Sequence, residues 1–125
     1  MALYRFAGLY VEMEARYDML KRRSAKYSAS ENAKPDIIIN LPETVLSDYQ
    51  AALKSLTLEE CEYMAIGTYF SYRLLDRGAA MLHSSAVAYE GRAYLFSAPC
   101  GTGKSTHTAL WKERFGSDNV KIIND

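Results

Sequence analysis

The residues of this chain best suited to chemistry lie in one short segment in its last third. The segment reads Ser97-Ala98-Pro99-Cys100-Gly101-Thr102-Gly103-Lys104-Ser105-Thr106 and contains the pattern G-x-G-K-[ST]. Glycines let successive backbone amides point into one concavity, where a phosphate group meets several N–H donors and the positive end of a helix. The lysine of such a loop reaches the terminal phosphates, and the hydroxyl that follows it ligates magnesium. The pattern therefore predicts a phosphate-binding loop, or P-loop.

Eight consecutive residues are the predicted nucleotide-binding residues: Pro99, Cys100, Gly101, Thr102, Gly103, Lys104, Ser105 and Thr106. Within this set Lys104 is also a candidate catalytic residue, and Ser105 is a candidate ligand of the metal. The expected cofactors are ATP and Mg²⁺. One alternative is a glycine-rich connection between strand and helix that binds no ligand. Cys100 leaves a second alternative, a regulatory thiol, because it stands in a loop with a neighbouring cation.

The loop departs from the fuller pattern G-x-x-x-x-G-K-[ST] at one position. Ala98 stands where that pattern has glycine. A methyl group fits this position only if the backbone there does not take a left-handed conformation. Ala98 is therefore a departure from the full pattern, and the backbone conformation at this position decides whether the loop tolerates it.

Strand and helix patterns flank the loop. Residues 84–89 and 92–97 suit a pleated surface and are separated by Glu90-Gly91, which predicts a β-hairpin. A helix is expected over 105–115, and an apolar strand over 120–123 follows it. The expected packed face of the helix consists of Ala109, Leu110, Trp111 and Phe115. The strand before the loop should thus pair antiparallel with its predecessor, unlike the strands of a doubly wound parallel sheet.

The sequence predicts two regions. Residues 1–78 form a separate α/β region of unassigned role, and residues 79–125 form a second region that contains the loop. The expected elements of the first region are a strand near 3–14, a short helix and loop within 15–34, a strand at 36–40, a helix at 43–55, and a helix from the capping box Thr57-x-x-Glu60 to Gly78. The expected packed stripe of the last helix consists of Tyr63, Ile66, Gly67, Phe70 and Leu74.

Composition excludes several classes of protein. Fifteen basic side chains balance fifteen acidic ones, which argues against a nucleic-acid protein with a broad basic face. No stretch approaches the roughly 18 consecutive apolar residues of a membrane-spanning helix, and the first residues lack a secretory pattern, so a cytoplasmic location is expected. Two cysteines and two histidines are too few for a disulfide scaffold and make a structural zinc site improbable.

The segment from Met81 to Ser97, together with the loop, resembles the catalytic domain of HPr kinase/phosphorylase. It is also similar to the matching part of ATP-dependent phosphoenolpyruvate carboxykinase. Both families place a histidine at the start of the first hairpin strand, a glycine at the turn and G-x-G-K-[ST] after the second strand. Here these are His83, Gly91 and Gly101 to Ser105. The resemblance implies an α/β fold with a mixed sheet, in which an antiparallel hairpin leads into the P-loop and its helix. It also implies that residues 79–125 are the start of a kinase-like domain, incomplete at its C-terminus.

The resemblance adds two catalytic candidates to Lys104. Both families follow the P-loop helix with an apolar strand ending in paired aspartates, and Asp125 matches the first of these. The match implies that Asp125, on a strand beside the P-loop strand, accepts the proton of the attacking hydroxyl or holds Mg²⁺. It places His83 near the phosphates, where it would orient or tune that carboxylate. The alternatives are a frayed terminal residue for Asp125 and a half-buried strand histidine for His83.

Three functions remain open on the sequence. The first is an ATP-binding, HPr-kinase-like phosphotransferase that acts on an unknown hydroxyl acceptor, on a protein or a small molecule; residues 1–125 alone are then expected to be inactive. The second is a carboxykinase-like lyase that converts oxaloacetate and ATP to phosphoenolpyruvate, and the third is a non-catalytic nucleotide-binding module. The expected partner is a nucleotide, with no nucleic acid and no membrane, and an oligomer is compatible with all three.

Overall fold

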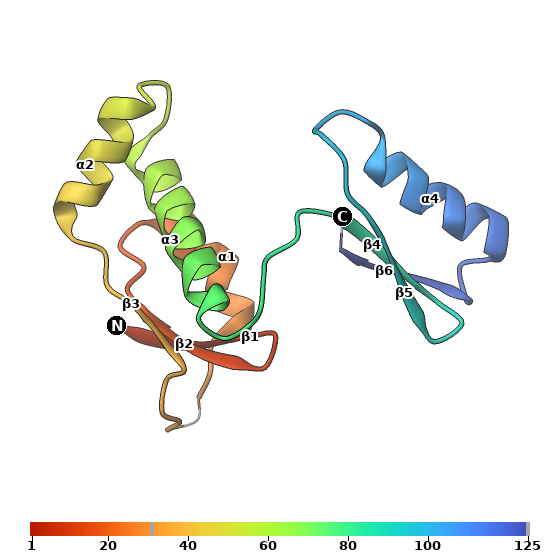
Figure 1. The fold of residues 1–125 in the computed structure, drawn as a ribbon, viewed down its shortest axis with the longest axis horizontal. Helices are drawn as coiled ribbons and strands as arrows, with labels where there is room; N and C mark the ends of the chain where they lie inside the picture. Colours follow the sequence, from red (N-terminus) through yellow and green to blue (C-terminus); the bar gives the residue numbers. More distant parts are fainter. Residues whose placement is uncertain (31, 125) are drawn as a thin grey trace. The chain divides into compact units, whose positions relative to one another are not determined.

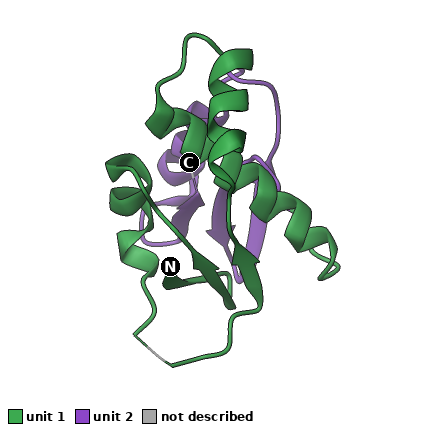
Figure 2. Ribbon diagram, turned by 90° about the vertical axis from the view of Figure 1, so that its left-hand side faces the viewer, with its two compact units in different colours: residues 1–80 green, residues 81–125 purple. Residues whose placement is uncertain are grey.

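The structure is a computed structural model that describes residues 1–30 and 32–124. It divides into two compact units, Met1–Ala80 and Met81–Asp125, which are coloured separately in Figure 2. The first unit combines a three-stranded sheet with several helices, and the described part of the second combines a three-stranded sheet with one helix, so the chain is a mixed α/β protein. No helix in the described part of the chain is long and apolar enough to cross a membrane.

The first unit begins with a β-hairpin where the sequence predicted one strand. The elements of this unit are β1 (Ala2–Phe6), β2 (Leu9–Met13), α1 (Asp18–Ser24), a 3₁₀ turn (Ala25–Tyr27), β3 (Ile37–Ile39), α2 (Glu43–Ala52) and α3 (Leu58–Leu75) (Figure 1). The single strand predicted near 3–14 is wrong, because Ala7 and Gly8 turn the chain with φ values of 49° and 88°. Two consecutive positive φ angles are typical of the tight turn that joins antiparallel strands.

The sheet of the first unit has the order β1-β2-β3, with β1 antiparallel and β3 parallel to β2. Apolar side chains from its strands pack with those of the helices. The buried core consists of Tyr4, Val11, Met13, Leu20, Ile37, Ile39, Leu41, Leu46, Ala65, Ile66 and Leu74. This core belongs to the first unit alone, which therefore has a hydrophobic interior of its own.

Helix α3 begins at the predicted capping box. The Thr57 side chain accepts from the Glu60 amide, and the Glu60 carboxylate accepts from the Thr57 amide at 2.8 Å. Ile66 and Leu74 are buried as predicted, but Tyr63 is 41% exposed and does not belong to the packed stripe. Glu62 lies next to it and is buried instead, so the packed face is rotated from the predicted one.

Glu62 is buried because its carboxylate is the acceptor for a distant segment of backbone. It is 1% exposed and accepts from the amides of Arg16 at 2.8 Å and Tyr17 at 3.1 Å. Tyr17 is the residue before helix α1, whose start has no side-chain cap of its own. A negative charge at this end also interacts favourably with the helix dipole.

The second unit contains the predicted hairpin, loop, helix and final strand. Its elements are β4 (Ser85–Tyr89), β5 (Arg92–Phe96), α4 (Lys104–Phe115) and β6 (Val120–Asn124). The sheet order is β5-β4-β6, with β5 and β6 both antiparallel to β4. The strand after the P-loop helix therefore pairs with β4. The expectation that it lies beside the strand leading into the loop is wrong, because β4 lies between β5 and β6.

Aromatic rings hold α4 against the sheet in the second unit. The Trp111 ring lies 4.7 Å from that of Tyr94, and the Phe96 ring lies 4.5 Å from the His107 imidazole. The predicted packed face of the helix is only partly correct, since Leu110 is 52% exposed whereas Thr108 is fully buried. The Thr108 hydroxyl donates to the Ser105 carbonyl at 2.9 Å, which satisfies it inside the core.

Candidate functional site

Residues 97–103 connect the end of β5 to the start of α4, the position that the sequence predicted for the phosphate-binding loop. Gly101 has φ 79° and Gly103 has φ 87°, a region of the backbone that glycine adopts without strain. A methyl group on Gly101 would meet no heavy atom within 4 Å, so the requirement for glycine there is one of backbone torsion. Among the described residues only Ala7 and Glu90 combine a side chain with a positive φ. Ala98 is therefore not left-handed, which is the condition under which its methyl group is compatible with the loop.

The start of α4 presents backbone amides at the end of this loop. Gly103 is the residue before the helix, with no side-chain hydrogen bond that caps it. Gly103, Ser105 and Thr106 are all exposed. The first N–H groups of a helix carry a partial positive charge and have no partner within the helix. An anion at this position would therefore find donors that point toward it.

Lys104 folds back over the loop from the first turn of α4. Its Nζ donates to the carbonyl oxygens of Ala98 at 2.8 Å and Pro99 at 3.0 Å. The hydroxyl of Thr102 also donates to the Pro99 carbonyl, at 2.8 Å. These hydrogen bonds connect the end of the loop and the start of α4 to the beginning of the loop, and they hold the lysine ammonium group against the loop. A phosphate at the amides of the loop would lie within reach of this cation.

His83 lies before the first residue of β4, Ser85, and is exposed. The reading of His83 as a half-buried strand histidine is therefore wrong. Its carbonyl oxygen accepts a hydrogen bond from the Ser97 hydroxyl at 3.0 Å, which ties it to the root of the loop. The other histidine, His107, is exposed; its ring packs against that of Phe96, and its Nε2 accepts from the Trp111 indole at 3.3 Å.

Residues from three segments meet at one end of the second sheet. Because β5 and β6 both run antiparallel to β4, their carboxyl ends lie at the edge where β4 begins. Asn124, at the end of β6, donates from Nδ2 to the Ser84 carbonyl at 2.6 Å. The loop root at Ser97, the segment of His83 and the end of β6 therefore meet there. Asp125 follows Asn124 directly, and it lies outside the described residues.

The described residues contain no group of three or more His, Cys, Asp or Glu side chains that could hold a metal ion. A magnesium ion bound with a nucleotide does not require such a group, since it keeps several waters and takes oxygens from the phosphates. The exposed Ser105 hydroxyl fits the part of a single protein ligand. Cys100 is exposed in the loop and is not in a disulfide.

The sequence did not predict the hydrogen bonds of Ser97 and Asn124. Each residue is polar and stands at the carboxyl end of a strand, which is the only signal for them in the sequence. The carbonyl acceptors are set by the strand order β5-β4-β6 and by the register, and neither follows from the local pattern.

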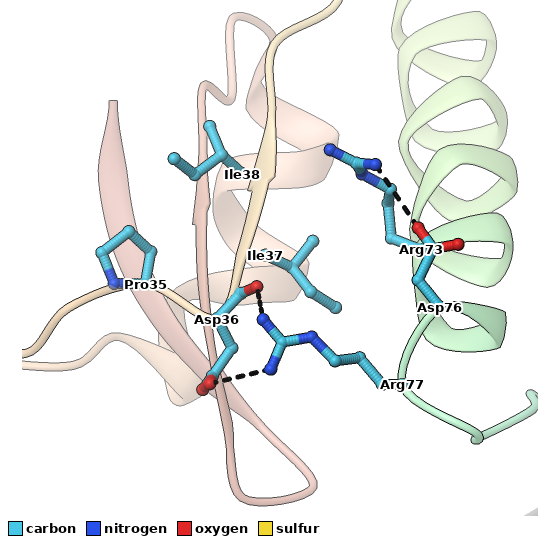
Figure 3. Close-up of a pocket in the computed structure, with 7 residues that line it drawn as sticks. All are labelled: Pro35, Asp36, Ile37, Ile38, Arg73, Asp76 and Arg77. Carbon is cyan, nitrogen blue, oxygen red and sulfur yellow. Dashed lines mark hydrogen bonds and ion pairs between the residues drawn. The ribbon is translucent and has the colours of Figure 1, made fainter.

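The first unit has a polar hollow of its own, shown in Figure 3. It measures about 290 Å³ and lies between the start of β3 and the residues at the end of α3. The Arg77 guanidinium contacts the Asp36 carboxylate at 3.3 Å, and that of Arg73 contacts Asp76 at 3.4 Å. Because both cations face carboxylates, the hollow offers no net charge to a ligand. It is not the predicted site.

Comparison with protein-family models, with curated proteins and with solved structures gives no match for this chain. The resemblance to HPr kinase and phosphoenolpyruvate carboxykinase therefore remains a prediction from the residues of the second unit.

Proposed function

We propose that the second unit binds Mg-ATP on the loop between β5 and α4, as the nucleotide-binding part of an HPr-kinase-like phosphotransferase. The observation that carries the proposal is the loop itself: Gly101 and Gly103 have positive φ, and Lys104 Nζ lies against the loop carbonyls. Amides of residues 100–105 would receive the phosphates, Lys104 would neutralise their charge, and Ser105 would contact the metal. Catalysis would come from positioning and electrostatic stabilisation.

The nucleotide must change the contacts of Lys104 for this function. In the structure the ammonium group bonds to the Ala98 and Pro99 carbonyls, at distances of 2.8 and 3.0 Å. Phosphate oxygens are charged acceptors and form stronger hydrogen bonds with an ammonium group than neutral carbonyls do. We therefore expect the ammonium to exchange loop carbonyls for phosphate oxygens when the nucleotide binds.

Lys104→Ala tests the proposal. Losing a hydrogen bond to a charged group should weaken Mg-ATP binding about ten- to a hundredfold. Isothermal titration of the full-length protein with Mg-ATP measures the change. The matched control is Lys112→Ala, which removes a lysine from the last turn of the same helix and should leave affinity within about twofold. Unchanged affinity in Lys104→Ala would show that the loop is not the nucleotide site.

The reaction that follows binding is tested separately. Transfer of the γ-phosphoryl group to a hydroxyl acceptor supports the phosphotransferase. Release of ADP that depends on oxaloacetate would instead identify the lyase. Tight binding without transfer or hydrolysis would identify a nucleotide-binding module.

A further inference from the structure

Two side chains, one directly after β5 and one at the end of β6, hold the backbone of His83 and Ser84. Ser97 follows β5, and its hydroxyl donates to the His83 carbonyl at 3.0 Å. Asn124 ends β6, and its amide donates to the Ser84 carbonyl at 2.6 Å. Because β5 and β6 lie on either side of β4, these two consecutive carbonyls are tied to both flanking strands. The segment that carries His83 is thus held from both sides, directly before β4 begins at Ser85.

An irregularity in the β4–β6 ladder sets the direction of the Asn124 side chain. Asn124 pairs with Ala86 and Ile122 pairs with Val87, so Ile123 is an extra residue between them. One extra residue in a strand reverses the face on which the following side chains lie. Without this bulge, Asn124 would lie on the opposite face of the sheet, and its amide would not be directed at the Ser84 carbonyl as it is here.

We propose that Ser97 and Asn124 are positioning residues that fix His83 beside the phosphate-binding loop. The inference rests on the proposed function and on the role near the phosphates that the resemblance to HPr kinase implies for His83. Residues 81–84 form no helix or strand, so their own backbone does not determine where the imidazole lies. Ser97 is also the first residue of the connection to α4. One hydroxyl therefore links the position of the histidine to the position of the loop.

The first measurement is the NMR signal of the His83 imidazole in the full-length protein without nucleotide, assigned as the signal that His83→Gln removes. Ser97→Ala and Asn124→Ala should each shift or broaden it. The matched control is Asn119→Ala, because Asn119 makes the same kind of bond, from Nδ2 to the Phe115 carbonyl at 2.9 Å, in the turn before β6. Asn119→Ala should leave the His83 signal unchanged. A His83 signal that neither Ser97→Ala nor Asn124→Ala alters would overturn the inference.

The second measurement is a double-mutant cycle on turnover of Mg-ATP by the full-length protein. Losing the Ser97 hydrogen bond should lower kcat about five- to tenfold with KM within about twofold, and Ser97→Thr, which keeps a hydroxyl, should restore most of it. In a His83→Gln background Ser97→Ala should cause no further loss, because its effect passes through the histidine. An equal loss in both backgrounds would assign Ser97 a role in the loop alone and overturn the inference.

The two measurements separate this inference from the proposed function. If the wild-type protein binds no Mg-ATP, the proposed function fails, and the NMR comparison still decides whether Ser97 and Asn124 hold His83. If Mg-ATP binds and turns over while the cycle shows no coupling, the proposed function stands and the positioning role fails.

Discussion

Gly101 and Glu62 show which single residues sequence patterns identify and which they miss. Gly101 belongs to a recognisable pattern, and its φ of 79° agrees with the reason that the pattern contains glycine. Glu62 stands in a helix, where a solvent-exposed carboxylate is the ordinary expectation. It is buried because the amides of Arg16 and Tyr17, 46 and 45 residues away in the chain, need an acceptor. Such a pairing depends on how the helices pack, so the sequence gives no local sign of it.

Gly101→Ala should destabilise the protein by about 1 kcal/mol, because an alanine at positive φ is strained even where its methyl group meets nothing. Gly67→Ala is the matched control. Gly67 lies inside α3, also with nothing within 4 Å of an added methyl group, but it has no positive φ. Alanine there should stabilise the protein by about 0.5–1 kcal/mol. Urea unfolding of both variants measures the two free energies, and the same sign for both would contradict this account.

Helices and strands were predictable where the spacing of apolar residues agrees with a capping or turn sequence at the end of the element. Helix α3 begins at its capping box, and the hairpin of β4 and β5 turns at Glu90-Gly91, as predicted. The turn at Ala7-Gly8 was missed because alanine seldom takes a positive φ, so the pair does not carry the Asn-Gly type of signal. The pairing of β6 with β4 was also missed. Strand order depends on contacts between distant segments, which no local period encodes.

The capping box of α3 should make stability depend on pH. Hydrogen bonds from the backbone and then the side chain of Thr57 lower the pKa of the Glu60 carboxyl below its usual value. The ionised form is therefore favoured in the folded state, and its contribution is present above the unfolded pKa and is lost as the pH falls through the lower, folded pKa. Urea unfolding from pH 7 to pH 3 should show a smaller acid loss in Glu60→Gln than in the wild type. An identical loss in both proteins would exclude this role for Glu60.

At the scale of the whole molecule, the proposed site and the largest buried core belong to different units. The core centred on Val11 and Ile37 lies within Met1–Ala80, whereas the loop lies within Met81–Asp125. The second unit covers one side of its sheet with α4, through Trp111 and its aromatic neighbours, and leaves Leu95 and Ile123 more than half exposed.

The charge balance of the chain is compatible with a phosphate ligand, since the donors expected to meet it are local amides and Lys104 rather than an extended basic surface.

This division predicts that Mg-ATP stabilises the second unit directly. Trp111 is the only tryptophan of the chain and packs in the second unit, 4.7 Å from Tyr94, so its fluorescence reports unfolding there. Cys61 is fully buried in the first unit, and labelling of its thiol, followed by mass spectrometry, reports opening of that unit. At a Mg-ATP concentration of one hundred times Kd, the Trp111 transition should gain about 2.7 kcal/mol, because ligand binds only the folded site. Lys104→Ala should reduce this gain at the same nucleotide concentration. A transition at Trp111 that Mg-ATP leaves unchanged, with Cys61 labelling slowed, would place the nucleotide on the first unit instead.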